Sequence, residues 1–149
     1  MTDENESTET ERLELTEAEW RARLNDAQYK VLREKATDIP FSGEFTHPGH
    51  RGVFRCAGCG AELFLSDTQF DSGSGWPSFT APVSSDVVEV STDRSYGMVR
   101  TEIACSRCGG HLGHVFPDGP GPSGERFCIN STALALDPKA DDVAATKSE

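Results

Sequence analysis

The chain contains no long hydrophobic run. None of its 149 residues lies in an apolar stretch near the roughly 20 residues that span a bilayer. The first residues also lack the basic segment and the apolar core of a signal peptide. Both absences argue against a membrane-bound or secreted protein, so we expect a soluble protein of the cytoplasm with no membrane partner.

Basic residues are few. Lysine and arginine number 14 against 25 aspartates and glutamates, which gives a net charge of -11 and a pI near 4.7. Proteins bind phosphate backbones through clustered lysine and arginine that release counterions. We therefore expect no nucleic-acid partner, and we attribute the acidity to solubility, as in adaptation to high salt.

Apolar residues are scarce at both ends. Residues 1–14 are rich in acids and residues 137–149 show no apolar periodicity, so we expect two solvated, disordered tails. Residues 15–136 suffice for a single domain, which at this size buries roughly two thirds of the surface of its unfolded chain. No feature of the sequence demands an oligomer, and we expect a monomer.

Helical periodicity is confined to the first part of this domain, "TEAEWRARLNDAQYKVLREKA". Thr16 precedes Glu19 by three residues, which is the spacing of a capping box, and Asn25 can divide the segment into two short helices. From Val53 onward, short β-like pieces alternate with clusters of Gly, Pro, Ser and Asp. The pattern predicts a mainly β domain with short N-terminal helices.

Four of the five cysteines form two Cys-x2-Cys pairs, in "CAGCG" (Cys56 and Cys59) and "CSRCGG" (Cys105 and Cys108). Four thiolates complete a tetrahedral zinc shell, whereas two disulfides are disfavoured in the cytoplasm. Residues 60–104 separate the pairs, a longer interval than the about 15–20 residues of a zinc ribbon. We predict one structural Zn²⁺ per chain, which joins two distant hairpins and has no open position for catalysis.

The fifth cysteine, Cys128, lies in "RFCIN". If this segment is a strand, Phe127 and Ile129 face one side, while Arg126, Cys128 and Asn130 face the other. A guanidinium beside a thiol stabilises the thiolate, which is the nucleophilic form. A free cysteine is more commonly a small buried hydrophobe, and the strand pattern alone leaves both interpretations open.

"HLGHVF" carries His111 and His114, which face opposite sides of a regular strand. They converge only if Gly113 introduces a bend or bulge. The pattern by itself favours one surface and one core histidine, and a further metal site is a weaker alternative. If they converge near Cys128, they are candidates for proton donation near neutral pH.

"FDSGSGWPSF" places Trp76 before Pro77, which keeps the tryptophan out of helical geometry. A tryptophan on such a stiffened loop is either a core residue or one wall of an apolar binding pocket. Composition does not decide between these two roles.

Taken in order, "PFSGEF", "CAGCGAELF", "FDSGSGWPSF", "CSRCGGHLGHVFPDGP" and "GERFCINS" resemble the B-type methionine sulfoxide reductases, which are methionine-R-sulfoxide reductases. The resemblance extends from about Leu15 to Leu136. It implies two antiparallel sheets in a barrel- or sandwich-like, zinc-stapled domain, with the zinc away from the active site. It also implies reduction of methionine-R-sulfoxide in proteins or peptides; whether free methionine sulfoxide is preferred stays open.

The resemblance assigns a role to each motif. Cys128 matches the catalytic nucleophile that becomes a sulfenic acid. His111 and His114 match residues that protonate the sulfoxide oxygen or hold a water that does. Arg126 and Asn130 are expected to lower the pKa of the thiol and to orient the substrate.

Three further residues match the substrate pocket and its surroundings. Trp76 and Phe116 correspond to the hydrophobic pocket for the ε-methyl group, and Asp118 to a residue that orients a histidine. Because pocket and proton donor would fix both methyl and oxygen, only the R epimer is expected to present its sulfur to Cys128.

One position departs from the family pattern, because Ser74 stands where many members have a resolving cysteine. A serine forms no disulfide, so we expect an external thiol, such as thioredoxin or a small dithiol, to reduce oxidised Cys128. A zinc-stapled binding module remains an alternative; it would need neither the thiolate nor the tryptophan pocket. A nucleic-acid-binding zinc ribbon is a third alternative, against which the charge argues.

Overall fold

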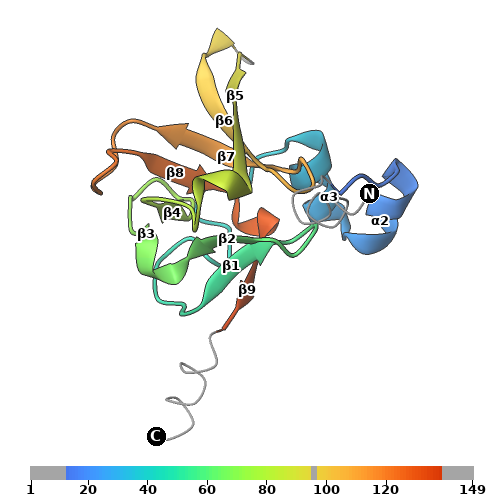
Figure 1. Ribbon diagram of the computed structural model, residues 1–149, viewed down its shortest axis with the longest axis horizontal. Coiled ribbons are helices and arrows are strands. Elements are labelled where there is room, and N and C mark those ends of the chain that lie inside the picture. The colour runs from blue at the N-terminus through green and yellow to red at the C-terminus, as the bar shows by residue number, and fades with distance from the viewer. Residues whose placement is uncertain (1–12, 95–96, 139–149) are drawn as a thin grey trace, which may run out of the picture.

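The computed structural model describes residues 13–94 and 97–138. These residues form two antiparallel sheets with two short helices at one side (Figure 1), so the mainly β fold is confirmed. Most of the two expected tails lies outside the described residues. At the boundaries, Leu13 donates a backbone hydrogen bond to the carbonyl of Arg107, and Asp137 pairs with Val53 in a sheet.

The helices are α2 (Glu17–Arg23) and α3 (Asp26–Glu34). The predicted capping box is present: the backbone N–H of Glu19 donates to Thr16 Oγ1 (3.1 Å), and the N–H of Thr16 donates to Glu19 Oε1 (2.8 Å). Asn25 caps α3 in the same way, which confirms the predicted division into two helices. Trp20 and Leu32 are buried on the inner side of this pair.

The smaller sheet has the strand order β2-β1-β9. Its strands are β1 (Val53–Cys56), β2 (Glu62–Leu65) and β9 (Leu134–Asp137). The larger sheet has the order β3-β4-β8-β7-β6-β5. Its strands are β3 (Gln69–Phe70), β4 (Ser78–Phe79), β5 (Val88–Asp93), β6 (Arg100–Cys105), β7 (His111–Phe116) and β8 (Arg126–Ile129).

Aromatic side chains join the two sheets. Phe64 of β2 stacks on Phe79 of β4 with ring centroids 4.4 Å apart, and Phe54 of β1 meets Phe79 edge-on at 5.4 Å. All three side chains are fully buried, and complete burial of a phenylalanine contributes about 1.5–3 kcal/mol. Phe127 and Ile129 of β8 also point into this core, as the alternation predicted. The opposite face of β8 is therefore left for the candidate site.

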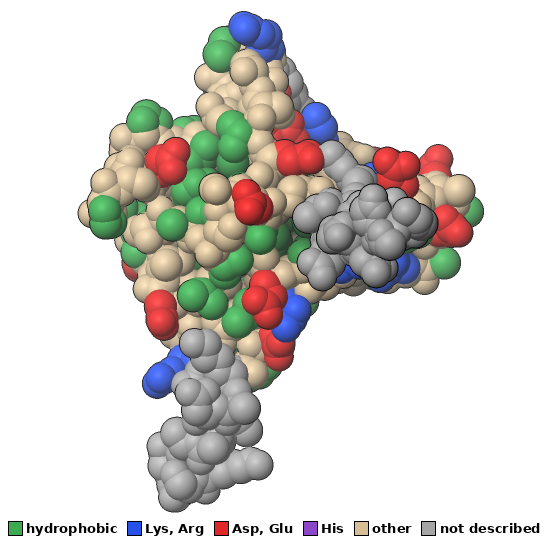
Figure 2. Space-filling view, viewed as in Figure 1, with side chains coloured by type: hydrophobic (Ala, Val, Ile, Leu, Met, Phe, Trp, Pro, Cys, Tyr) green, Lys and Arg blue, Asp and Glu red, His purple; other side chains and the backbone are tan. Residues whose placement is uncertain are grey.

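The surface in view carries acidic side chains spread among single basic ones (Figure 2). The acidic side chains in view are scattered over this face and do not gather in one patch. In the part of the chain that the structure describes, no helix is long and apolar enough to cross a membrane.

Candidate functional site

Cys128 lies in the middle of the larger sheet, between β4 and β7. Ser78 is its partner on β4 and His114 its partner on β7. Directly opposite residues in antiparallel strands have side chains on the same face of the sheet. The half-buried thiol of Cys128 therefore shares its surroundings with a hydroxyl and an imidazole.

These residues border a cavity of about 240 Å³. It is lined by Thr37, Ser74, Trp76, Arg100, Gly113, His114, Phe116, Arg126, Cys128 and Asn130. The sequence analysis proposed eight catalytic or substrate-binding residues, and six of them line this one cavity. The other two lie around it: His111 is buried against His114, and Asp118 is bound to Arg126.

A bulge in β7 explains how the two histidines meet. Ile103 of β6 pairs with Gly113, but its neighbour Ala104 pairs with His111, so Leu112 is an extra residue on β7. One additional residue reverses the alternation of side chains beyond it. The bend that the sequence made a condition for convergence is therefore present.

The imidazole rings of His111 and His114 lie 5.6 Å apart, centroid to centroid, at 70°. Both residues are buried, at 3% and 9% exposure, so one surface and one core histidine is not the arrangement found. Gly113 is needed for this backbone path, because an added Cβ would lie 2.0 Å from the carbonyl oxygen of Cys128. The two strands can approach so closely only at a glycine.

A buried carboxylate holds His111. His111 Nδ1 lies 2.8 Å from Glu102 Oε2, and Lys35 Nζ lies 3.2 Å from Glu102 Oε1. Burial acts to raise the pKa of Glu102, but the hydrogen bonds from His111 and Lys35 outweigh it and lower that pKa. Burial lowers the pKa of His111, although Glu102 opposes the change. An ionised Glu102 thus accepts the Nδ1–H of a neutral imidazole.

A second carboxylate holds His114. His114 Nε2 lies 2.9 Å from Asp93 Oδ2, and an Arg100 side-chain nitrogen lies 3.3 Å from the same oxygen. Each histidine is therefore oriented by its own acid, His111 by one on β6 and His114 by one on β5. Such partners determine which ring nitrogen is left to face a ligand.

Arg126 is the cation next to Cys128, and it is paired with Asp118. Arg126 Nε donates to Asp118 Oδ1 at 2.8 Å, and the guanidinium lies 4.6 Å from the ring centroid of Phe116. The ion pair lowers the pKa of Asp118. Asp118 meets Arg126 across the β7–β8 connection, and the carboxylates bound to the two histidines are Glu102 and Asp93. That Asp118 orients a histidine stays a prediction.

Burial raises the pKa of the Cys128 thiol. A hydrogen bond with the Ser74 hydroxyl and the charge of Arg126 both act to lower it, without cancelling the effect of burial. The expected effect of Arg126 on the thiolate is present, but it is weaker than desolvation.

Trp76 is a pocket wall, since its side chain is half-buried and lines the cavity. Its indole Nε1 donates to the carbonyl of Asp38 at 3.0 Å. The backbone N–H of Asp38 in turn donates to Asn130 Oδ1 (2.8 Å), and Asn130 Nδ2 donates to the carbonyl of Leu112 (3.1 Å). The loop that carries Trp76 is thereby tied to the β8 terminus and to the bulge.

Sequence reasoning missed several residues of this site: Thr37, Arg100, Glu102, Asp93 and Asp38. Glu102 and Arg100 lie in the alternating strand "MVRTEIAC", so their common face was readable from the sequence. Their contacts were not readable, because they depend on the register between strands.

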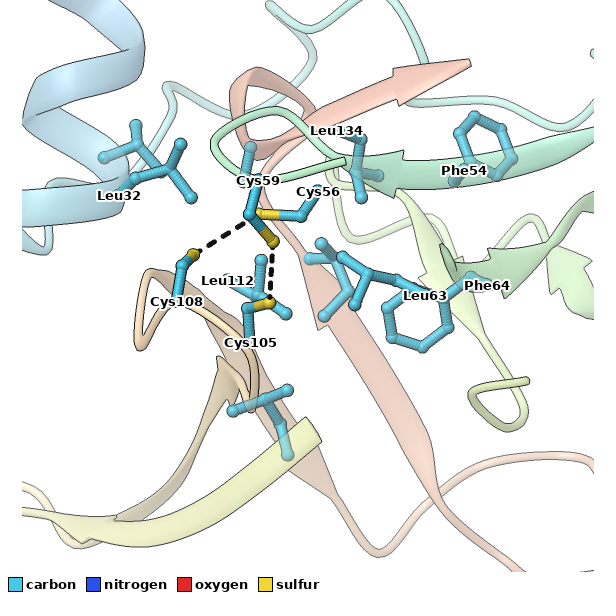
Figure 3. Close-up of a cluster of buried hydrophobic side chains, with 14 of the residues drawn as sticks. Leu32, Phe54, Cys56, Cys59, Leu63, Phe64, Cys105, Cys108, Leu112 and Leu134 are labelled. Atoms are coloured by element: carbon cyan, nitrogen blue, oxygen red, sulfur yellow. Dashed lines mark hydrogen bonds between the residues drawn. The ribbon is translucent and has the colours of Figure 1, made fainter. Parts of the chain in front are cut away.

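The four paired cysteines form a separate centre (Figure 3). Their sulfurs lie within 4.8 Å of one another, with 3.7 Å between Cys56 and Cys108 and 3.6 Å between Cys59 and Cys105. Zn–S bonds of about 2.3 Å in a tetrahedron place sulfurs about 3.8 Å apart, so these donors fit zinc. All four residues are buried, and the cluster can bind a metal ion.

This centre lies where the two sheets meet. Cys56 ends β1 in the smaller sheet, and Cys105 ends β6 in the larger one. A bound ion would therefore connect the two sheets. None of the four cysteines lines the cavity around Cys128.

A larger hollow of about 590 Å³ lies on the other face of the larger sheet. Its floor includes Val115 and Phe127, which alternate with His114 and Cys128 along the same strands. The described residues that line it include no cysteine or histidine. The smaller cavity is therefore the candidate site for chemistry.

Comparison with known proteins gave consistent matches. The family model of the SelR domain matches residues 24–138. A protein of Bradyrhizobium diazoefficiens named peptide methionine sulfoxide reductase MsrB is 55% identical over 139 residues, which cover 93% of this chain and 100% of that protein. The protein of the same name in Methanosarcina barkeri is 56% identical over 122 residues, 82% of this chain and 86% of that protein. A Mus musculus protein named methionine-R-sulfoxide reductase B3, mitochondrial, is 51% identical over 123 residues, 83% of this chain and 49% of that protein.

Proposed function

The chain belongs to the SelR-domain family of methionine-R-sulfoxide reductases, and from this premise we propose that it reduces methionine-R-sulfoxide in oxidised proteins or peptides. The observation that supports this most directly is the cavity in which Cys128, His114, Trp76 and Phe116 meet. It combines a nucleophile, a proton donor and an apolar wall within about 240 Å³, which is room for one side chain.

In this proposal the cavity holds the end of the oxidised side chain. Trp76 and Phe116 enclose the ε-methyl group, and the sulfoxide oxygen points to the imidazole of His114. Since Asp93 Oδ2 lies 2.9 Å from His114 Nε2, the protonated imidazole would present its Nδ1–H to that oxygen and act as the proton donor. Asn130, which is fixed by its bonds to Asp38 and Leu112, orients the substrate beside it.

The chemical step is a two-electron transfer at sulfur. The Cys128 thiolate attacks the sulfoxide sulfur and forms an S–S bond, while the oxygen takes up a proton from the histidine side. The S–O bond of the substrate and the new S–S bond then break as the hydroxyl passes to the sulfur of Cys128, which leaves methionine and a cysteine sulfenic acid. The substrate sulfur is reduced and the cysteine sulfur is oxidised.

The stereoselectivity of the proposed reaction follows because two groups of the substrate are held in fixed positions. The aromatic wall determines the position of the methyl group and His114 that of the oxygen. Only one epimer then directs its sulfur to Cys128; by family membership, this is the R epimer.

Regeneration requires a thiol from outside the site. Ser74 provides no sulfur, and the four paired cysteines are buried in their own cluster. An external thiol, from thioredoxin or a small dithiol, condenses with the sulfenic acid to a mixed disulfide and water. A second thiol then releases Cys128 and forms the reductant disulfide. A reducing cytoplasm would maintain this supply of thiols.

The four-cysteine cluster holds a structural Zn²⁺ in this proposal, and the protein acts as a monomer. When bound, zinc cross-links the hairpins that carry Cys56 and Cys105. Structural zinc contributes on the order of 10 kcal/mol to folding, which is comparable to the stability of a whole domain.

A steady-state assay on the separated R and S epimers of a peptidyl methionine sulfoxide, with dithiothreitol as reductant, tests the proposal. We expect turnover of the R epimer alone. Turnover of the S epimer alone, or of neither, would overturn it.

A further inference from the structure

Three serine hydroxyls form a continuous chain that ends at the catalytic sulfur. Ser74 Oγ lies 3.8 Å from Cys128 Sγ and 2.8 Å from Ser72 Oγ. Ser72 Oγ lies 2.7 Å from Ser78 Oγ, which is 3.1 Å from the carbonyl oxygen of Trp76. The chain thus extends from the sulfur of Cys128 to the backbone of the loop that carries Trp76.

The backbone holds these hydroxyls in place. Ser78 is fully buried on β4, directly opposite Cys128. The N–H of Ser74 donates to Ser72 Oγ at 3.2 Å, and the N–H of Trp76 donates to Ser74 Oγ at 3.4 Å. Gly73 between the first two serines has a φ of 75°, a left-handed conformation that glycine adopts without strain. The tight loop "SGSGW" therefore brings the hydroxyls together.

Each hydroxyl has one proton, so the chain has two consistent directions. With Cys128 as a thiolate, Ser78 donates to Ser72, Ser72 donates to Ser74, and Ser74 donates to the sulfur. With Cys128 as a thiol, all of these bonds reverse, and Ser78 donates to the carbonyl of Trp76. Every proton has an acceptor in both states.

We propose that Ser74, Ser72 and Ser78 form a reversible hydroxyl chain that stabilises the thiolate of Cys128. Ser74 is then a catalytic residue, because its hydroxyl contacts the reacting sulfur. Ser72 is a positioning residue that acts through Ser74, whereas Ser78, directly opposite Cys128 on β4, also acts on the thiol itself. The effect on turnover rests on the proposed function, whereas the effect on the ionisation of Cys128 does not.

The charged groups around Cys128 are paired with groups of opposite charge, so the serine hydroxyls still have a role in stabilising its thiolate. The charged or titratable groups that face it from neighbouring elements are Arg126 with its partner Asp118, His114 with its partner Asp93, and Arg100 on β6. The positive charge of Arg126 is compensated by Asp118 at 2.8 Å. Burial raises the pKa of Cys128, and Ser74 and Ser78 both act to lower it.

A chain makes a prediction that a single contact does not. Hydrogen bonds in series polarise one another, so removing the middle hydroxyl should weaken the donor at the sulfur. Ser72 is separated from Cys128 by Ser74 and is absent from the described lining of the cavity. An effect of Ser72 on Cys128 therefore distinguishes a chain from an isolated Ser74 contact.

The experiment measures the pH dependence of Cys128 alkylation by iodoacetamide in the zinc-loaded protein, followed by mass spectrometry of the Cys128 peptide. The variants are Ser72→Ala, Ser74→Ala and the conservative Ser74→Thr, which retains the hydroxyl. Ser123→Ala is the matched control, since Ser123 is exposed and its hydroxyl bonds outside the cavity, donating to the carbonyl of Thr80 and accepting from the N–H of Glu125. Ser78→Ala is avoided because this buried residue can affect folding.

We expect the alkylation midpoint to rise by about one pH unit, a tenfold loss of thiolate at a given pH, in both Ser72→Ala and Ser74→Ala. Ser74→Thr and Ser123→Ala should keep the wild-type midpoint. If Ser72→Ala kept the wild-type midpoint, the proposed hydroxyl chain would be refuted. If Ser74→Ala also kept it, the proposed effect of the Ser74 hydroxyl on the Cys128 sulfur would be refuted as well. A wild-type protein inactive on methionine-R-sulfoxide would refute the proposed function instead, and the alkylation midpoints would still decide the inference.

Discussion

The hydroxyl oxygen of Ser74 lies 3.8 Å from the sulfur of Cys128. A cysteine at position 74 would place a second sulfur next to Cys128, and a disulfide of about 2.05 Å then requires the two sulfurs to move closer together. The residue at this position therefore decides whether oxidised Cys128 has a partner within the chain.

We predict that Ser74→Cys converts the chain to one with an internal disulfide. One equivalent of methionine-R-sulfoxide should leave the variant about 2 Da lighter by non-reducing mass spectrometry, while the wild type gains about 16 Da as a sulfenic acid. Ser74→Cys combined with Cys128→Ser is the control and should show neither change. An internal disulfide to Cys128 in the wild type would contradict the expected external reduction.

Cys128→Ser should abolish turnover and leave the metal centre intact. A serine hydroxyl at this position neither ionises near neutral pH nor accepts the oxygen, so activity on the R epimer should fall at least about a thousandfold. The metal content, measured by plasma mass spectrometry, should stay at one zinc per chain. Retained turnover of the R epimer would contradict the role of Cys128 as the nucleophile.

Removal of the metal should unfold the domain, because the four-cysteine cluster connects the two sheets. Zinc binding is worth on the order of 10 kcal/mol, against about 5–15 kcal/mol for the stability of a typical domain. Cys105→Ser or treatment with a strong chelator should therefore lower the melting temperature steeply in thermal unfolding. The opposite result, an unchanged melting temperature after complete loss of zinc, would show that the aromatic core suffices.

Glu102→Gln should change the pH dependence of stability. The pKa of Glu102 is lowered in the folded state, so its contribution is present above the unfolded value of about 4.3 and is lost as the pH falls through the folded value. The pKa of His111 is also lowered, so acidification below about 6.5 favours the unfolded chain, which binds that proton more readily. Both effects reduce the stability of the wild type in acid.

Urea unfolding between pH 7 and pH 3 measures this. At pH 7 the variant should be less stable by about 1–3 kcal/mol, since a buried hydrogen-bonded carboxylate is lost, and the difference should shrink only below about pH 4.3, where Glu102 of the wild type takes up its proton. Glu62→Gln is the matched control, because Glu62 is exposed and its bond with Arg55 lies on the surface. If the stability of Glu102→Gln and the stability of Glu62→Gln depended on pH in the same way, a role of Glu102 in holding His111 would be contradicted.

Asp93→Asn should weaken catalysis by releasing the ring of His114. We expect kcat to fall about tenfold to a hundredfold, as for general acid–base catalysis, with KM on peptidyl methionine-R-sulfoxide little changed. The pH profile of kcat should also move, which a purely structural effect would not produce. Asp67→Asn, at a surface 3₁₀ turn, serves as the control. If Asp67→Asn lowered kcat as much as Asp93→Asn, the proposed role of Asp93 in orienting His114 would be contradicted.

The helices and strands were readable from the sequence wherever the signal is local. The capping box at Thr16 and the break at Asn25 depend on neighbours three residues apart, and the alternation around Cys128 depends only on the strand period of two. β3 and β4, with two residues each, are too short for any period to be visible. They nevertheless place Ser78 directly opposite Cys128.

The sequence by itself determined the chemical inventory: four paired thiols of zinc-binding spacing, a fifth thiol on a polar strand face, and a serine where a resolving cysteine would stand. Spacing and alternation carry this information because they act within a few residues. The tertiary structure alone decided the contacts. The bulge at Leu112 brings His111 and His114 together, Asp118 binds Arg126, and Ser74 reaches Cys128. These pairings join residues of different strands and loops, and their register is established only when the two sheets pack.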